Sequence, residues 1–85
     1  MITEYNKNCL ICGRPSENIH HLCFGNALRR LSDEDGLTIP VCYPCHEEIH
    51  HNKVAMQMSR IIGQMEYEKT HTREQFRKRY GVSYL

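Results

Sequence analysis

The residues best suited to chemistry are five cysteines and six histidines, most of which stand in short motifs. The segment Cys42–His50 holds a CxxC pair followed by two histidines. Each half has an upstream counterpart, because Cys9 and Cys12 form another CxxC pair and His20 and His21 are adjacent. Thiolates and imidazoles bind transition metals, and imidazole also transfers protons near neutral pH. The sequence therefore predicts two metal sites, one structural and one catalytic.

The first predicted site contains four cysteines, and we interpret it as structural. Two CxxC pairs suit a tetrahedral zinc ion, and four thiolate ligands leave no open position for a substrate. Disulfides are disfavoured in the cytosol, where we expect the protein because its polar N-terminus resembles neither a signal peptide nor a membrane span. The alternatives are two disulfides or free thiols in a core. The expected ligands are Cys9, Cys12, Cys42 and Cys45, and the remaining Cys23 is expected to be a packed free thiol.

The second predicted site contains four histidines. Three imidazoles would hold a divalent ion with open positions for a phosphate oxygen and water. The fourth would act as general base on the attacking water. The alternative is that one member of the adjacent pair is a satisfied core histidine and that the downstream pair lies on a helix surface. The candidates are His20, His21, His46 and His50.

The composition limits the function without fixing it. A chain of 85 residues buries little apolar surface, so a metal ion is a common source of additional stability. The net charge of +1 lacks the strongly basic balance of a dedicated nucleic-acid binder. Basic residues still gather at two places, where they could contact phosphates or simply form a solvated helix face. These residues are Arg29, Arg30, Arg73, Arg77, Lys78 and Arg79.

Short elements must position the histidines. Residues 19–24 and 37–41 are expected to form two strands, and alternation places His20 and His21 on opposite faces of the first. Asn26 is a candidate cap for a helical turn at 27–31, and 32–36 is expected to be a loop. Pro44 suits the first turn of a helix. On that helix His46 and His50 lie at i and i+4, one above the other.

Two further helices are expected after Lys53. The first shows an apolar stripe with helical spacing and ends near 70–71. The stripe can pack on the chain's own core or on a second copy, so a homodimer stays open, and the methionines in it are expected in the core. The second begins at a capping box of Thr72 and Gln75. The stripe contains Val54, Met58, Ile61, Ile62 and Met65, the last helix turns Phe76 and Tyr80 inward, and Gly81 caps it.

Together these motifs resemble the HNH (ββα-metal, His-Me finger) endonucleases, especially small phage-borne members with a four-cysteine zinc and the recombination-dependent nucleases of the Ref type. The tail segments 67–76 and 81–85 are also similar. The resemblance implies an α+β fold: one small zinc-stabilised, treble-clef-like ββα-metal domain over 1–85, with its core at 9–52 and two additional C-terminal helices in 53–85.

The resemblance also implies site roles and an activity. His21 matches the general base, and His20, His46 and His50 match ligands of a catalytic divalent ion, Mg²⁺ or another. The implied reaction is metal-dependent hydrolysis of a DNA phosphodiester bond, often by nicking. A phage-encoded protein of this kind would work in the host cytosol. Its expected partner is DNA, and no association with a membrane is expected.

One departure from the family pattern keeps a second function open. The central Asn of the family, which pins the loop that carries the base, is missing before the second CxxC pair, where the chain reads Asp35-Gly36-Leu37. Either Asp35 or backbone takes its place, or catalysis is weaker. The main alternative is therefore a catalytically inactive, zinc-bound DNA- or protein-binding module. A redox role for the CxxC pairs is disfavoured because no βαβ pattern surrounds them.

Overall fold

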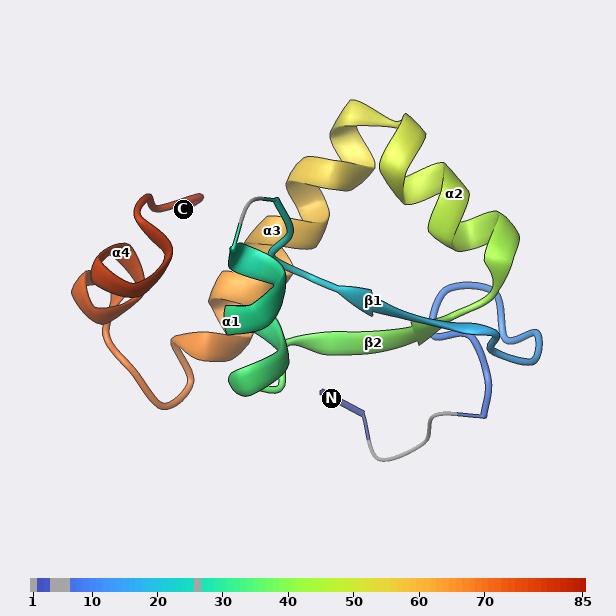
Figure 1. The fold of residues 1–85 in the computed structure, drawn as a ribbon, viewed down its shortest axis with the longest axis horizontal. Coiled ribbons are helices and arrows are strands. Elements are labelled where there is room, and N and C mark those ends of the chain that lie inside the picture. Colours follow the sequence, from blue (N-terminus) through green and yellow to red (C-terminus); the bar gives the residue numbers. More distant parts are fainter. Residues whose placement is uncertain (1, 4–6, 26) are drawn as a thin grey trace.

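The computed structural model describes residues 2–3, 7–25 and 27–85. They form a small α+β fold with a two-stranded sheet and four helices (Figure 1). No helix in this described part combines the length and apolar character that crossing a membrane requires. The elements in chain order are β1 (Asn18–His21), α1 (Leu28–Glu34), β2 (Thr38–Val41), α2 (Tyr43–His51), α3 (Lys53–Tyr67) and α4 (Arg73–Tyr80).

Both predicted strands are present, and they pair antiparallel with His20 opposite Ile39 and His21 opposite Thr38. The first strand is shorter than expected and ends at His21, although Leu22, Cys23 and Phe24 are all buried. The chain leaves the ladder because both backbone groups of Cys23 bond to one side chain. The Ser32 hydroxyl accepts from the Cys23 N–H at 3.1 Å and donates to the Cys23 carbonyl at 2.6 Å.

The helix between the strands is longer than the predicted turn. We expected a loop over 32–36, but α1 continues to Glu34, so this prediction was wrong for its first three residues. The extra turn is stabilised by an Asp35 N–H bond to the Leu31 carbonyl at 2.9 Å and by the burial of Ser32. The predicted cap, Asn26, lies outside the described residues.

The helix that carries the downstream histidines starts where the sequence indicates. Cys42 is the N-cap of α2 and Pro44 lies in its first turn, where a missing N–H costs no hydrogen bond. After α2 the chain turns sharply at Asn52, whose side chain accepts hydrogen bonds from the N–H groups of Val54 and Ala55. In Figure 1, α2 and α3 form a bent pair of helices beside the sheet.

The apolar stripe of α3 does not face the core, which corrects the prediction for its methionines. Met58 and Met65 are 55% and 56% exposed. The buried face holds Ser59, Gly63, Gln64 and Tyr67 instead. Glycine is needed at position 63 because a Cβ there would lie 2.9 Å from the Cys23 sulfur. A homodimer through the exposed stripe stays a prediction.

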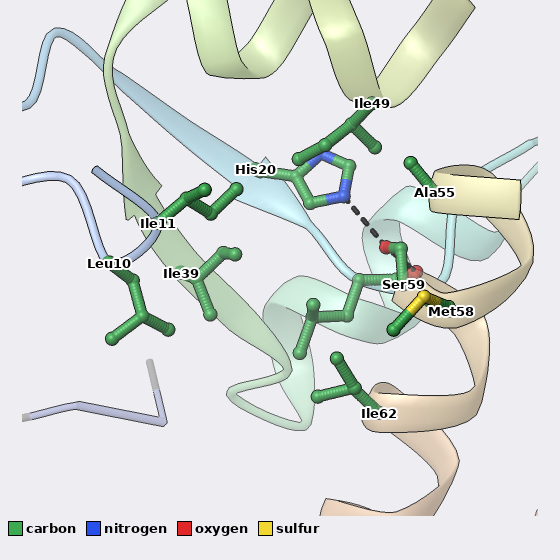
Figure 2. A pocket seen from close by; sticks show the side chains of 10 residues that line it. Leu10, Ile11, His20, Ile39, Ile49, Ala55, Met58, Ser59 and Ile62 are labelled. Atoms are coloured by element: carbon green, nitrogen blue, oxygen red, sulfur yellow. Dashed lines mark hydrogen bonds between the residues drawn. The ribbon is translucent and has the colours of Figure 1, made fainter. Parts of the chain in front are cut away.

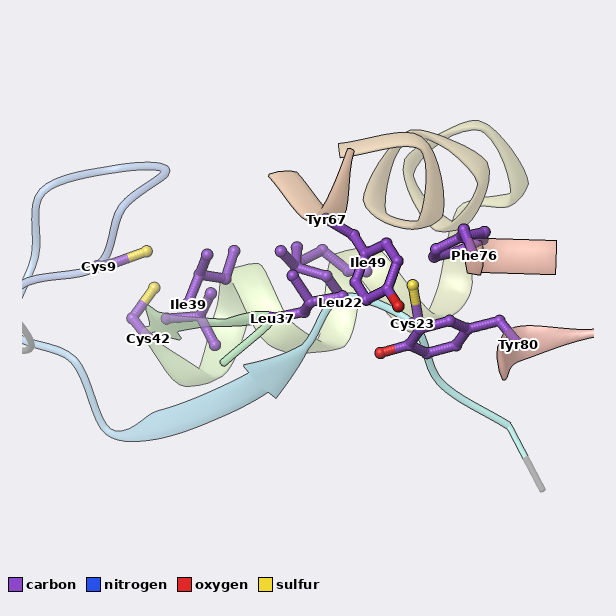
Figure 3. Close-up of a cluster of buried hydrophobic side chains, with 11 residues drawn as sticks. Cys9, Leu22, Cys23, Leu37, Ile39, Cys42, Ile49, Tyr67, Phe76 and Tyr80 are labelled. Carbon is purple, nitrogen blue, oxygen red and sulfur yellow. The ribbon is translucent and has the colours of Figure 1, made fainter. Parts of the chain in front are cut away.

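The C-terminal helix begins and ends as predicted. Thr72 and Gln75 form the capping box, and Gly81 closes α4 in the left-handed conformation. The helix α3 ends at Tyr67, a few residues before the predicted end. Figure 3 shows the core as a row of side chains that runs from the cysteines at one end to Phe76 and Tyr80 at the other, both buried as expected.

The close approach of α3 to the end of β1 gives a first prediction. Gly63→Val should lower the free energy of unfolding, because overpacking a core costs about 1–3 kcal/mol. The gain in helix propensity relative to glycine is smaller than about 1 kcal/mol. Denaturant unfolding measures the change. Gln57→Val, on the exposed side of the same helix, is the matched control and should leave stability nearly unchanged; an equal effect of both variants would contradict the packing argument.

Candidate metal centres and the histidine cavity

The four predicted cysteines come together in one cluster. Their sulfur atoms all lie within 4.8 Å of one another, and those of Cys12 and Cys42 are 3.4 Å apart. All five cysteines of the chain are free, so the alternative of two disulfides is not adopted. The first pair is held by a tight turn, in which Gly13 donates to the Cys9 carbonyl at 3.0 Å with a positive φ of 80°. The turn is attached to β2, because the Leu10 N–H donates to the Pro40 carbonyl at 2.9 Å.

The electrostatics of this cluster favour metal binding. Burial raises the pKa of Cys9, but N–H groups of the Cys12, Cys42 and Ile11 backbone outweigh it and lower that pKa to about 6. The thiol of Cys45, which bonds to the sulfur of Cys42 and is partly desolvated, has its pKa raised to about 12. The thiolate of Cys9 therefore forms readily while the thiol of Cys45 resists ionisation, and a bound cation would favour the thiolate form of both. The four residues could hold a metal such as zinc.

Three of the four predicted histidines form a second cluster. One ligand atom from each of His20, His46 and His50 lies within 4.8 Å of the others. His46 and His50 are one turn apart on α2, and their Nε2 atoms are 3.2 Å apart. The rings of both lie 5.3–5.4 Å from the ring of His20 on β1. The strand and the helix thus bring together side chains that are distant in sequence, as we expected.

The surroundings of His20 and His46 disfavour protonation of these two imidazoles. His20 is only 1% exposed, and burial, together with the neighbouring His46, His50 and His21, lowers its pKa to about 3. The pKa of His46 is also lowered, mainly by burial and then by His50. A neutral imidazole is the form that binds a metal ion. His50 is exposed and His46 is half-buried, so the cluster is reached from solvent on the α2 side.

The fourth histidine, His21, lies beside the cluster and outside it. His20 and His21 alternate on β1, one buried and one half-buried, yet both border a cavity of about 270 Å³ that His46 and His50 also line. The Nε2 atom of His21 is 3.6 Å from a carboxylate oxygen of Asp33. Arg29 is the cationic side chain on the cavity wall. The candidate base His21, three histidines that could hold a metal ion and the cationic Arg29 therefore border one recess.

Of the two substitutes expected for the missing Asn, the backbone does bond the segment after His21, because the Leu22 N–H donates to the Leu37 carbonyl at 2.9 Å. The carboxylate of Asp35 points to α4, where it accepts hydrogen bonds from the Arg79 side chain at 2.6 Å and the Tyr80 hydroxyl at 2.7 Å. Asp35 therefore does not hold the segment that follows His21. That segment is also pinned by the buried hydroxyl of Ser32, through its two bonds to the Cys23 backbone.

The candidate phosphate-binding residues fall into two groups. Of the six candidate residues, Arg29 is the one that lines the histidine cavity in the described part of the chain. Arg73, Arg77 and Lys78 line a separate recess on α4. Several of these cations are engaged by acids: Arg30 pairs with Glu34, Arg73 with Glu68, Lys78 with Glu74, and Arg79 with Asp35 and Glu34.

Sequence reasoning missed three residues around the cluster, which are Ser59, Phe24 and Arg60. The Ser59 hydroxyl is 2.8 Å from Nε2 of His20 (Figure 2), and the ring of Phe24 lies 5.0 Å from that of His50. The guanidinium of Arg60 covers the Phe24 ring at 4.4 Å. Ser59 and Arg60 belong to no recognisable sequence motif. Only the orientation of α3 about its own axis shows that Ser59 faces His20 and that Arg60 covers Phe24.

The chain is similar to known proteins in two respects. A family model described as "Protein of unknown function (DUF968)" matches residues 4–72. A mitochondrial DNA mismatch repair protein mutS homolog from Sarcophyton glaucum is 32% identical over 53 residues, which cover 58% of this chain and 5% of the relative. The chain thus spans a small fraction of the length of that curated relative. No solved structure matches the chain.

The cysteine cluster gives a second prediction. Cys42→Ser should abolish zinc binding and unfold the chain, because binding to a structural site contributes directly to folding free energy. Zinc content by elemental analysis and helix content by circular dichroism measure both effects. Cys23→Ala removes a cysteine that lies outside the cluster and should retain one zinc at that site. A Cys42→Ser chain with an unchanged Tm and no metal would refute the structural role.

Proposed function

The chain belongs to the DUF968 family, and we propose that it is a metal-dependent DNA endonuclease of the HNH type, with a treble-clef-like ββα-metal core. One observation carries the proposal: three imidazoles that can share an ion border the same recess as a fourth histidine. In the ββα unit the strands are β1 and β2 and the helix is α2. The cysteine cluster ties the turn before β1 to the start of that helix.

The donor set fits a divalent ion that takes part in catalysis. His20, His46 and His50 would hold it, and three protein ligands leave positions open, unlike the four thiolates of the cysteine cluster. When bound, the ion would polarise a phosphate oxygen and stabilise charge on the leaving 3′ oxygen. Imidazole ligands favour a transition metal in affinity, whereas phosphate chemistry commonly uses Mg²⁺. The plasmid assay described below therefore compares Mg²⁺ with the transition metal Mn²⁺.

His21 is proposed as the general base. It is half-buried at the cavity wall and is not a member of the three-histidine cluster, so its imidazole is free to accept a proton. The imidazole would take one proton from a water molecule as the water oxygen attacks phosphorus. The bond from phosphorus to the leaving oxygen then breaks. Asp33, at 3.6 Å, is placed to favour the imidazolium that results.

The backbone after His21 must hold this base in position. Ser32, buried in α1, binds both backbone groups of Cys23. We assign to it the pinning of this segment, so the lack of an Asn does not leave the base unsupported. Because the bonds run to backbone atoms, the arrangement does not depend on the side chain at position 23.

DNA is the proposed substrate. Arg29 on the cavity wall can contact a phosphate next to the scissile one. The α4 recess with Arg77 offers a second phosphate contact. The name of the mutS relative places that protein in DNA mismatch repair, which supports DNA as the partner. Few side chains surround the cavity, so weakly specific nicking is favoured over recognition of a long sequence.

A supercoiled-plasmid assay tests the proposal. Wild type should convert supercoiled DNA to the nicked form with Mg²⁺ or Mn²⁺ and not with EDTA. His21→Ala should lower the rate by at least about 100-fold, because general base catalysis contributes roughly 10²–10⁴-fold. Folding and zinc content should be unchanged, since the side chain of His21 belongs to neither metal cluster.

The matched control is His51→Ala. His51 follows α2's ligand histidines but is exposed and pairs with Glu47 at 3.0 Å, so its loss should leave nicking intact. Equal rates for wild type and His21→Ala would eliminate the assignment of the base. Retardation of plasmid without cleavage in any metal would instead favour an inactive, zinc-bound DNA-binding module on the same scaffold.

A further inference from the structure

The hydroxyl of Ser59 links the histidine cluster to α3. Its oxygen lies 2.8 Å from Nε2 of His20 and 2.8 Å from the backbone carbonyl oxygen of Leu22. Both side chains are buried, Ser59 at 5% exposure and His20 at 1%. Figure 2 shows Ser59 at one ring nitrogen of His20, with the other ring nitrogen pointing away from it.

The bond from Ser59 to Leu22 determines which atom donates in the contact between Ser59 and His20. A serine hydroxyl has one hydrogen, and the Leu22 carbonyl can only accept, so that hydrogen is donated to Leu22. The serine oxygen is then an acceptor toward His20. A hydrogen must therefore lie on Nε2 of His20. Buried beside two other imidazoles, the ring carries a single hydrogen, and Nδ1 is left with an unshared electron pair.

The position of Ser59 is itself fixed by packing. Gly63 lies one turn further along α3, and its backbone comes so near the end of β1 that an added Cβ would be 3.0 Å from the Cβ of Leu22. The same close contact brings the Ser59 hydroxyl to the Leu22 carbonyl. A larger residue at position 63 would move α3 away from the end of β1 and break both hydrogen bonds of the Ser59 hydroxyl.

We propose that Ser59 is a positioning residue that locks His20 in the Nε2–H tautomer and so presents Nδ1 as the ligand atom toward the ion shared with His46 and His50. The proposal rests on the metal site of the proposed function and deepens it. Ligand histidines are commonly oriented by a hydrogen bond at the second ring nitrogen, and losing that partner costs about 10–100-fold in metal affinity. Here the partner comes from α3, outside the ββα unit.

The first test reads the tautomer in the wild-type protein. The full-length chain, with zinc in the cysteine site and no other metal added, is labelled with ¹⁵N, and long-range ¹H–¹⁵N spectra are recorded for the histidine rings. His20 should show the pattern of a neutral ring protonated at Nε2. A pattern protonated at Nδ1 would overturn the proposal, and this measurement requires no variant to fold.

The second test measures affinity for Co²⁺ by calorimetry on the same chain with zinc in the cysteine site, because thiolate ligands select zinc and that site is then already filled. Ser59→Ala should weaken Co²⁺ binding about 10–100-fold, and Ser59→Thr, which keeps a hydroxyl, should restore it. Ser83→Ala is the matched control, because it removes a hydroxyl that bonds to Gln64, and it should bind Co²⁺ as wild type does.

The outcomes separate this proposal from the nuclease assignment. Wild-type affinity in Ser59→Ala would refute the positioning role, as would a failure of wild type to bind Co²⁺ at the histidines. A chain that never nicks DNA, yet shows the Nε2–H tautomer and loses Co²⁺ affinity in Ser59→Ala, would sustain the role of Ser59 and reject the nuclease.

Discussion

The geometry of the molecule depends on the four sulfur atoms that join the turn before β1 to the start of α2. Cys42 directly follows β2 and is also the N-cap of α2, so its position sets the direction in which the helix leaves the sheet. That direction brings His46 and His50 over His20. In a chain of 85 residues the apolar core alone is a weak support for such placement. The four cysteines could hold a metal ion, and such an ion would fix the helix against the sheet.

The histidine cluster illustrates how a fold can prepare ligands. Burial and mutual repulsion disfavour the protonated form of His20 and lower its pKa to about 3. Protonating this ring is unfavourable, so protons compete weakly with a metal ion for its unshared electron pair. The cluster also contributes to core formation, because the ring of His20 packs against Phe24 as well as against the imidazoles. Stability and metal affinity are therefore linked at one residue.

Much of this arrangement could be predicted from the sequence because its signals are local. The CxxC pairs, the i, i+4 spacing of His46 and His50, and the Thr72 capping box each involve residues a few positions apart, and all three appear as expected. The rotation of α3 could not be predicted in this way. Periodicity showed an apolar stripe, but the close approach of Gly63 to Cys23 turned that stripe outward.

Residues that act across long sequence separations were also missed. The bonds of Ser59 to His20 and of Asp35 to Tyr80 join positions 39 and 45 residues apart. A lone serine or aspartate has no spacing rule that identifies its partner. Ser32 likewise shows no spacing pattern and was assigned to a loop. Its hydroxyl bonds to both backbone groups of Cys23 and so holds the segment that follows His21. Supporting residues of a site are thus less visible in the sequence than its ligands.

The most direct test of this account is the number of metal ions that one chain binds. Native mass spectrometry of the zinc-saturated protein should show two ions on the wild-type chain, one for each cluster. A double variant with His46→Ala and His50→Ala should carry one and remain folded. A wild-type chain that binds a single ion, or a double variant that still binds two, would contradict the existence of a separate metal centre at the histidines.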